Sequence, residues 1–334
     1  MRAPRLAAAQ PLTLLLVCLA LCSACSDPEP LAVSKAEPPR MPVYPSVEPP
    51  TMPPPMPARS IQPTHARLPD VAWREEGGAV RGFAQLRSAP FPMEGAPYDD
   101  STVLIAFPEQ LDRTQPVPVV IHLHGFNVEL REMVRSKQLV EQLLLSGRNA
   151  VLIVPQGPLL ANSGHFGRLM HPDGFKNLVT DVLAVLARDA FIERPEPGPV
   201  VVSAHSGGYK AASRAILVGG LRVETVFLFD SLYGEVEVFK SFVERGGRLR
   251  SLYTDGGGTR GRNLTLMGLL EEEGILTSDR LRGPGTRAVI SWSSQGHSDC
   301  VRVGRPFTRW LAGSGLPRLP GALPPELGRR WASQ

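Results

Sequence analysis

Cysteine is scarce in this sequence of 334 residues, which contains only four. Cys18, Cys22 and Cys25 lie close to the N-terminus, and Cys300 stands alone in the rest of the chain. A lone cysteine has no partner within its own domain, so a disulfide-stabilised scaffold is excluded for that part. The fold must rest on an apolar core instead, and the 43% hydrophobic content is ample for one.

Clusters of basic or metal-ligating residues are also missing. The 36 basic and 32 acidic residues give a formal net charge of +4, but no Lys/Arg-rich block occurs, which argues against a nucleic-acid partner. Residues 256–259 (GGGT) lack the Lys-Ser/Thr pair of a phosphate-binding loop. His165, His171 and Asp173 share one segment without the spacing of a metal site. We therefore expect no nucleic acid, no metal and no cofactor.

The N-terminal segment is typical of an export signal. Arg2 and Arg5 precede the apolar run 12–21, which is too short to cross a bilayer because crossing takes about 20 apolar residues. Residues 21–25 (LCSAC) resemble a bacterial lipobox, although Cys22 stands where leucine is usual.

The lipobox resemblance implies that residues 1–25 form a lipoprotein-type signal peptide and that Cys25 is lipidated. Its acyl chains would anchor the protein to a membrane of the bacterial cell envelope. A box that ends at Cys22 is an alternative with a poorer match. An ordinary secretory signal, cleaved near Ala24, would release a soluble protein instead.

Proline is concentrated near both ends of the chain. Fourteen of the 34 prolines fall within residues 26–70, a stretch poor in large apolar side chains. We expect this stretch to be a disordered linker that holds the later domain away from a membrane. Residues 314–334 are also rich in proline and are expected to form a loosely attached C-terminal tail.

Between these segments, strand-like apolar runs alternate with amphipathic, helix-like runs. The expected strands are 79–86, 102–107, 117–123, 150–154, 199–204, 225–229, 249–253 and 288–292. The expected helices are 128–145, 174–191, 207–217, 235–244, 263–273 and 301–311. Unbroken apolar runs such as 151–154 (VLIV) indicate strands buried on both faces. The pattern predicts a single α/β domain over residues 71–313, with a doubly wound, mostly parallel, eight-stranded sheet flanked by helices.

The strongest functional motif follows the expected strand 199–204. Catalytic groups in parallel sheets gather beyond the carboxyl ends of the strands, and residues 204–208 (AHSGG) lead from this strand directly into a helix. The segment resembles the nucleophile elbow of the α/β-hydrolase family, in which the residues two before and two after the serine must be small. Ala204 and Gly208 meet that need, although the family more often has glycine at the first position. The resemblance implies that Ser206 is a nucleophile.

Two further loops extend the α/β-hydrolase resemblance. Residues 124–126 (HGF) follow the third expected strand, where the family carries a His-Gly pair. The resemblance implies that the backbone N–H groups of Phe126 and Gly207 form an oxyanion hole. His297 follows the last expected strand and is the only histidine after His205, so the resemblance assigns it the role of general base.

Two aspartates are candidates for the acid that orients His297. Asp255 follows the seventh expected strand, the usual position in the family, but it also begins an Asp-Gly turn that explains it structurally. Asp230 follows the sixth, where some lipases carry the acid, and no turn explains it. We prefer Asp230 and keep both.

The α/β-hydrolase resemblance implies a serine hydrolase that cleaves a carboxylic ester, or a related acyl bond, through a Ser-His-Asp triad and an acyl-enzyme. The expected substrate is a small-molecule or lipid-like acyl compound. Residues 155–172 are expected to act as a specificity loop or partial lid, with Phe166, Leu169 and Met170 roofing the site. The alternatives are a serine peptidase or amidase acting on cell-envelope material, and a non-catalytic lipoprotein that uses the fold as a binding scaffold.

Overall fold

The computed structural model describes residues 68–93, 98–275, 277–278 and 286–321, all of which belong to one compact unit. The predicted signal peptide, with the candidate lipidation site Cys25, lies outside the described residues, as does the predicted linker up to residue 67. Within the described ranges, no helix combines the length and the apolar character that crossing a membrane requires.

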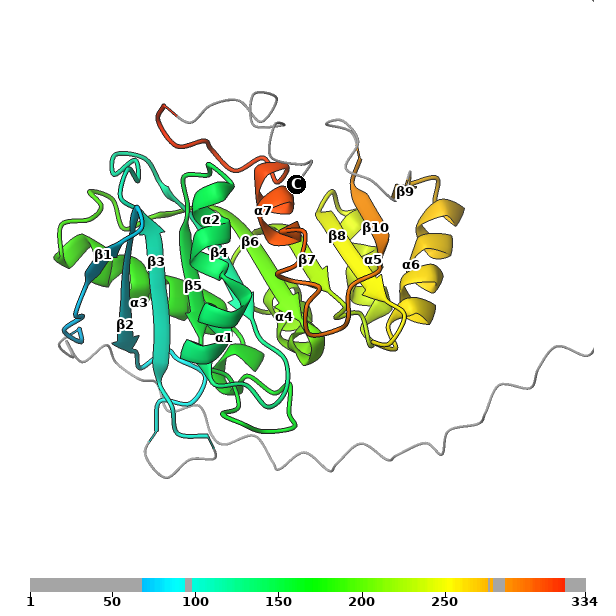
Figure 1. Cartoon of the computed structure of the whole chain (residues 1–334), viewed down its shortest axis with the longest axis horizontal. Coiled ribbons are helices and arrows are strands. Elements are labelled where there is room, and N and C mark those ends of the chain that lie inside the picture. The colour runs from blue at the N-terminus through cyan, green and yellow to red at the C-terminus, as the bar shows by residue number, and fades with distance from the viewer. Residues whose placement is uncertain (1–67, 94–97, 276, 279–285, 322–334) are drawn as a thin grey trace, which may run out of the picture. The chain divides into compact units, whose positions relative to one another are not determined.

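A single ten-stranded sheet forms the centre of the described part (Figure 1). Its strands are β1 (Arg74–Glu76), β2 (Ala79–Gln85), β3 (Thr102–Pro108), β4 (Val117–Leu123), β5 (Val151–Pro155), β6 (Pro197–His205), β7 (Val223–Phe229), β8 (Arg248–Thr254), β9 (Thr277–Ser278) and β10 (Ala288–Ser293). Their spatial order is β1-β2-β3-β5-β4-β6-β7-β8-β10-β9. In this order, the first three pairs (β1-β2, β2-β3 and β3-β5) are antiparallel. All the following pairs, from β5-β4 to β10-β9, are parallel.

The predicted α/β class and mostly parallel sheet are confirmed, but the predicted count of eight strands is wrong. All eight predicted strands occur, and two short strands, β1 and β9, are added at the two edges of the sheet. β1 has three residues (REE) and β9 has two (TS). Runs this short and polar carry neither an apolar run nor an alternation, so the sequence gives no sign of them.

Helices cover both faces of the sheet (Figure 1). They are α1 (Leu130–Lys137), α2 (Leu139–Leu145), α3 (Gly174–Arg188), α4 (Tyr209–Leu217), α5 (Val236–Glu244), α6 (Arg260–Glu272) and α7 (Pro306–Ala312), with 3₁₀ turns η1 (Gly167–Met170) and η2 (Ser206–Gly208). One buried cluster packs helices α3, α4, α5 and α6 against one face of the sheet. A second packs α1, α2 and α7 against the other face. Neighbouring strand residues such as Val120 and Ile121 enter opposite clusters, which explains the unbroken apolar runs.

Two predicted helices have different bounds in the structure. The expected helix 128–145 is divided into α1 and α2 because Gln138 adopts a left-handed φ of 53°. The last helix begins at Pro306 rather than at residue 301, because proline suits the first turn of a helix, where no N–H is needed.

The packed chain extends beyond the predicted domain bounds of 71 and 313. The guanidinium of Arg188 donates hydrogen bonds to the carbonyls of Leu68 (3.0 Å) and Pro69 (2.8 Å). In the predicted tail, Leu316 is buried, and the backbone N–H of Leu319 donates to the carbonyl of Gly147 at 3.0 Å. Residues 314–319 are therefore attached to the domain, in contrast to the predicted loose coil, because Leu316 supplies an apolar anchor.

Candidate active site

Ser206 lies on the turn between β6 and α4, at the carboxyl edge of the parallel strands. Its φ of 53° is in the left-handed region, which is uncommon for a residue with a side chain and is found at strained functional turns. The turn is tight, because a Cβ at Gly208 would lie only 2.6 Å from the carbonyl oxygen of Leu123 on β4. The strand–helix turn thus directs the Ser206 side chain away from the helix and toward the loops beyond the sheet.

Three side chains from separate elements form a hydrogen-bonded chain. Ser206 Oγ lies 2.9 Å from Nε2 of His297, and Nδ1 of His297 lies 2.8 Å from Oδ2 of Asp230. Asp230 follows β7 directly, and His297 lies in the loop after β10. A carboxylate accepts hydrogen bonds only, so Nδ1 carries the ring proton and Nε2 can accept the hydroxyl proton of Ser206.

The Asp230 carboxylate is completely buried and has several donors besides His297. The Thr254 hydroxyl donates to it at 2.5 Å, and the Thr259 hydroxyl donates to its other oxygen. Burial alone would raise the pKa of Asp230, but hydrogen bonds from His297, Thr254 and Thr259 outweigh burial and lower the pKa below its ordinary value. The group is therefore an ionised acceptor at neutral pH.

The glycine run after β8 lies against this carboxylate. A Cβ at Gly257 would overlap the Asp230 side chain, whereas a Cβ at Gly256 would meet open space. Asp255, the other candidate acid, accepts a hydrogen bond from Nε1 of Trp292 at 3.0 Å, at an exposed position. The structure thus brings Asp230 into contact with His297 and places Asp255 on a turn where it pairs with Trp292.

The two amides expected to form an oxyanion hole belong to loops that touch each other. A Cβ at Gly207 would overlap the ring of Phe126, and a Cβ at Gly125 would lie 2.7 Å from Cβ of Ser206. Among the described residues outside helices and strands, the N–H of Phe126 donates to no backbone carbonyl. That N–H is therefore without a backbone partner near Ser206.

His124 ties the loop after β4 to the loop after β5. Its Nδ1 donates to the carbonyl of Gly125 at 2.7 Å, and its Nε2 accepts from the backbone N–H of Gly157 at 2.8 Å. Burial lowers the pKa of His124 to about 4, so the ring is neutral at pH 7, as one donated and one accepted bond require. Its role is to fix the backbone beside Phe126.

The loop after β5 covers part of the elbow, but with other residues than predicted. Leu160 N–H donates to the carbonyl of Val128 at 3.2 Å, and the backbone of Gly164 lies against Gly207. Leu160 itself is 65% exposed.

Phe166 and Leu169, which were predicted to roof the site, are completely buried in the core instead, and Met170 packs against that core. Large apolar side chains gain more from burial in the core than from lining an open edge. The prediction that these three residues form a roof is therefore corrected.

Several neighbours of the candidate catalytic groups are not predicted from the sequence. The Ser231 hydroxyl donates to the carbonyl of Ser206 at 2.6 Å. The ring of Tyr233 lies edge-on to that of His297, with their centres 6.4 Å apart, and burial, together with the charge of Asp230, raises the pKa of Tyr233 to about 12. Both follow Asp230 closely in sequence, which is the one signal that could have suggested them. Among the described residues, no group of three or more histidine, cysteine or acidic side chains could hold a metal ion.

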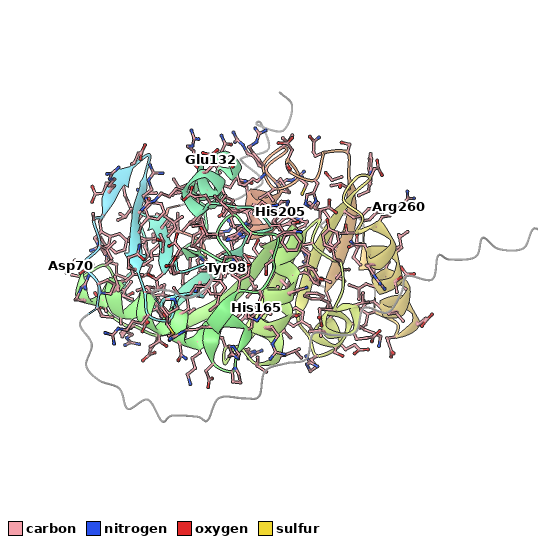
Figure 2. All side chains as sticks on the ribbon, turned by 90° about the horizontal axis from the view of Figure 1, so that it is seen from below. Asp70, Tyr98, Glu132, His165, His205 and Arg260 are labelled. Atoms are coloured by element: carbon pink, nitrogen blue, oxygen red, sulfur yellow. The ribbon has the colours of Figure 1, made fainter. Side chains whose placement is uncertain are left out.

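His205 is the other missed residue, and it lies beside His297. Figure 2 shows it in the middle of the domain, whereas Glu132 and Arg260 lie at the surface. Nε2 of His205 donates to the backbone carbonyl of His297 at 2.9 Å. Its position directly before Ser206 gave no hint of this contact, because the partner lies 92 residues further along the chain.

No family model matches this chain, and no curated protein matches it. Solved structures that resemble it include a fungal esterase from Rhizomucor miehei (14% identity, 73% of this chain and 81% of that chain, TM-score 0.40). A siderophore hydrolase, EstB, from Aspergillus nidulans has 15% identity over 74% of this chain and 99% of its own, with a TM-score of 0.39. An IroE-like serine hydrolase from Shewanella oneidensis has 12% identity over 73% and 78%, with a TM-score of 0.40. The overall likeness to these structures is low, so the function proposed below rests on the geometry of the site.

Proposed function

We propose that the protein is a serine hydrolase that cleaves carboxylic esters through a covalent acyl-enzyme. The observation that carries this proposal is the hydrogen-bonded chain from Ser206 through His297 to the buried Asp230. A serine hydroxyl is a weak nucleophile and needs an adjacent base, which in turn needs a group that fixes its tautomer. All three lie beyond the carboxyl ends of parallel strands, where such sheets bind ligands.

In the acylation step, Ser206 Oγ attacks the acyl carbon while Nε2 of His297 takes the hydroxyl proton. The carbonyl oxygen becomes an oxyanion that faces the N–H groups of Phe126 and Gly207, and one such donor is worth about 10²–10³ in rate. The C–O bond to the alcohol then breaks, and the alcohol leaves with the proton that His297 carried. Asp230 stabilises the imidazolium between the two proton transfers.

In the deacylation step, a water molecule gives a proton to His297 and its oxygen attacks the acyl carbon. The bond to Ser206 Oγ breaks, the carboxylic acid is released, and His297 returns the proton to the serine. The net reaction converts one ester and one water into one acid and one alcohol.

Exposed apolar side chains near the elbow favour an apolar acyl group. Phe126, which contacts Gly207, is 38% exposed, and Leu160 is 65% exposed on the loop that covers the elbow. Covering such side chains with hydrocarbon is favourable, because it removes apolar surface from water. We therefore propose small and lipid-like acyl esters as the substrates. The preference for esters over amides rests on the α/β-hydrolase resemblance of residues 204–208.

The test is labelling with a fluorophosphonate, which reacts with an activated serine and loses fluoride. The wild-type protein is expected to be labelled, Ser206→Ala unlabelled, and Ser294→Ala, which removes an exposed serine from the His297 loop, labelled like the wild type. Turnover of p-nitrophenyl esters of increasing chain length, beside a panel of aminopeptidase substrates, distinguishes ester from amide specificity. A wild-type protein that is neither labelled nor active would contradict the proposal and favour a binding scaffold.

We further propose that the enzyme is held in the bacterial cell envelope by lipid on Cys25. The lipobox-like residues 21–25 and the proline-rich residues 26–70 support this location, since the former would supply the anchor and the latter a spacer.

A further inference from the structure

The last residue of β6, His205, contacts the backbone of the proposed base. It lies directly before Ser206 and is 9% exposed. Its Nε2 donates a hydrogen bond to the carbonyl oxygen of His297 at 2.9 Å, and the two rings lie 4.8 Å apart at an angle of 30°. One strand end therefore carries both the proposed nucleophile and a bond to the chain segment that carries the base.

His205 is neutral at the pH at which esterases work. Burial, above all, lowers the pKa of His205 to about 3; the hydrogen bond to the His297 backbone acts in the opposite direction but is outweighed. A carbonyl oxygen only accepts, so the single proton of the neutral ring lies on Nε2. A neutral donor can hold the His297 backbone without repelling the imidazolium that forms during each proton transfer.

His297 needs such support because it lies in a loop, outside any helix or strand. Its carbonyl accepts a second bond from the thiol of Cys300 at 3.2 Å, and the N–H of Cys300 donates to Gly296 at 3.0 Å. A thiol is a weak donor, so the bond from His205 is the stronger of the two on this carbonyl. A misplacement of about 1 Å in a reacting group costs on the order of 10² in rate.

We propose that His205 is a positioning residue that fixes the backbone of His297 and thereby keeps its ring within hydrogen-bond distance of Ser206. This inference rests on the proposed hydrolase function. His205 is not a hydrogen-bond partner of Ser206 Oγ or of the His297 ring nitrogens, and in this proposal it acts through its bond to the carbonyl of His297. The residue inside the elbow thus connects the turn that presents the nucleophile to the loop that presents the base.

The test compares three variants of His205 and one control variant in hydrolysis of a p-nitrophenyl ester. His205→Leu fills the space but has no donor, and we expect kcat to fall about 10- to 100-fold with KM within about twofold. His205→Gln has an amide N–H that reaches about as far as Nε2, and we expect it to recover kcat to within about fivefold of the wild type. His205→Asn carries the same amide on a shorter side chain and is expected to lose activity like His205→Leu.

The matched control is His122→Leu, which removes a completely buried imidazole from the neighbouring strand β4. It is expected to lower the melting temperature as His205→Leu does while changing kcat by no more than about threefold. Should His205→Leu fail to fold, the comparison of the Gln and Asn variants carries the test. Full kcat in a folded His205→Leu or His205→Asn variant, or equal losses in the Gln and Asn variants, would overturn the inference while leaving the hydrolase function intact. A wild-type protein without esterase activity would overturn both.

Discussion

At the scale of single residues, the Asp230 carboxylate shows how the site is stabilised before a substrate binds. The group is completely shielded from water and accepts hydrogen bonds from His297, Thr254 and Thr259. A buried charge is costly unless such partners surround it, and loss of one partner leaves the carboxylate less fully compensated. The acid and its donors therefore act as one unit that holds the His297 ring.

Exchange of the two candidate acids tests this role. Asp230→Asn is expected to lower kcat by about 10³–10⁴, because an amide N–H facing Nδ1 favours the tautomer whose Nε2 cannot accept the serine proton. Asp255→Asn is expected to stay within about threefold, since Asp255 pairs with the exposed Trp292 instead. Ester turnover of both variants is the measurement. A large loss in Asp255→Asn alone would assign the acid to Asp255.

The sequence identifies some residues of the site far better than others. Ser206 is predicted from a local pattern, because the whole elbow lies within residues 204–208, and His297 is predicted from its place as the only histidine after the last expected strand. The acid has no local pattern, since any aspartate at a suitable strand end qualifies, so the sequence alone does not distinguish Asp230 from Asp255. His205 and Thr259 were missed because their partners lie 92 and 29 residues away.

At the scale of elements, the turn after β8 shapes the carboxylate pocket. Gly257 lies against Asp230, and Gly256 beside it faces open space. The sequence pattern predicts a simple turn here, yet a Cβ at Gly257 would overlap the Asp230 side chain, whereas a Cβ at Gly258 would make only an ordinary 3.8 Å contact with the Tyr233 ring. The absence of a Cβ at Gly257 leaves room for the acid.

The neighbouring glycines provide a matched pair for a test. Gly257→Ala is expected to displace the Asp230 carboxylate and to lower kcat by about 10² or more, because the carboxylate cannot leave its donors without releasing His297. Gly256→Ala is expected to remain within about twofold, since its Cβ meets nothing within 4 Å. Steady-state ester kinetics measure both. Equal activity of the two variants would show that the turn moves freely away from Asp230.

The sequence predicts correctly the strands whose structure is determined by an apolar pattern. The eight main strands are apolar on one or both faces, so their runs are visible in the sequence. β1 and β9 form at the sheet edges through pairing with a neighbouring strand, which local sequence does not encode. The division of α1 from α2 depends on the left-handed Gln138, a residue type with no preference for that conformation.

At the scale of the whole molecule, three buried histidines make stability depend on pH. His122, His124 and His205 lie at the ends of the adjacent strands β4 and β6. Burial lowers the pKa of His122 well below its ordinary value, that of His124 to about 4 and that of His205 to about 3. Below pH ~6.5 the unfolded chain therefore binds protons that the folded protein does not.

We expect the free energy of unfolding to be highest above pH ~6.5 and to fall as the pH decreases, by up to ~1.4 kcal/mol per pH unit for each buried histidine. Urea unfolding between pH ~7 and ~5 measures this slope. His122→Gln is expected to flatten the slope, whereas replacement of the exposed His171 by glutamine is expected to leave it unchanged. Identical slopes for both variants would contradict the explanation.

The proposed lipid anchor is tested on the full chain in cells. Cys25→Ser is expected to move the protein from the membrane to the soluble fraction after lysis without detergent, because the acylated residue is lost. Cys22→Ser, a change three residues earlier, is the matched control and is expected to stay in the membrane fraction. Release by Cys22→Ser instead would assign the alternative lipobox, and unchanged partitioning of both variants would end the anchor proposal.

The proposed catalytic groups come from the ends of three different strands. His297 lies 91 residues after Ser206 and 67 after Asp230, and it follows the last long strand, β10. A chain cut short before residue 288 would contain the nucleophile and the acid but no base. In the proposed mechanism, hydrolysis begins only once residue 297 has been synthesised and β10 has paired with β8, so turnover would report that this last long strand is in place.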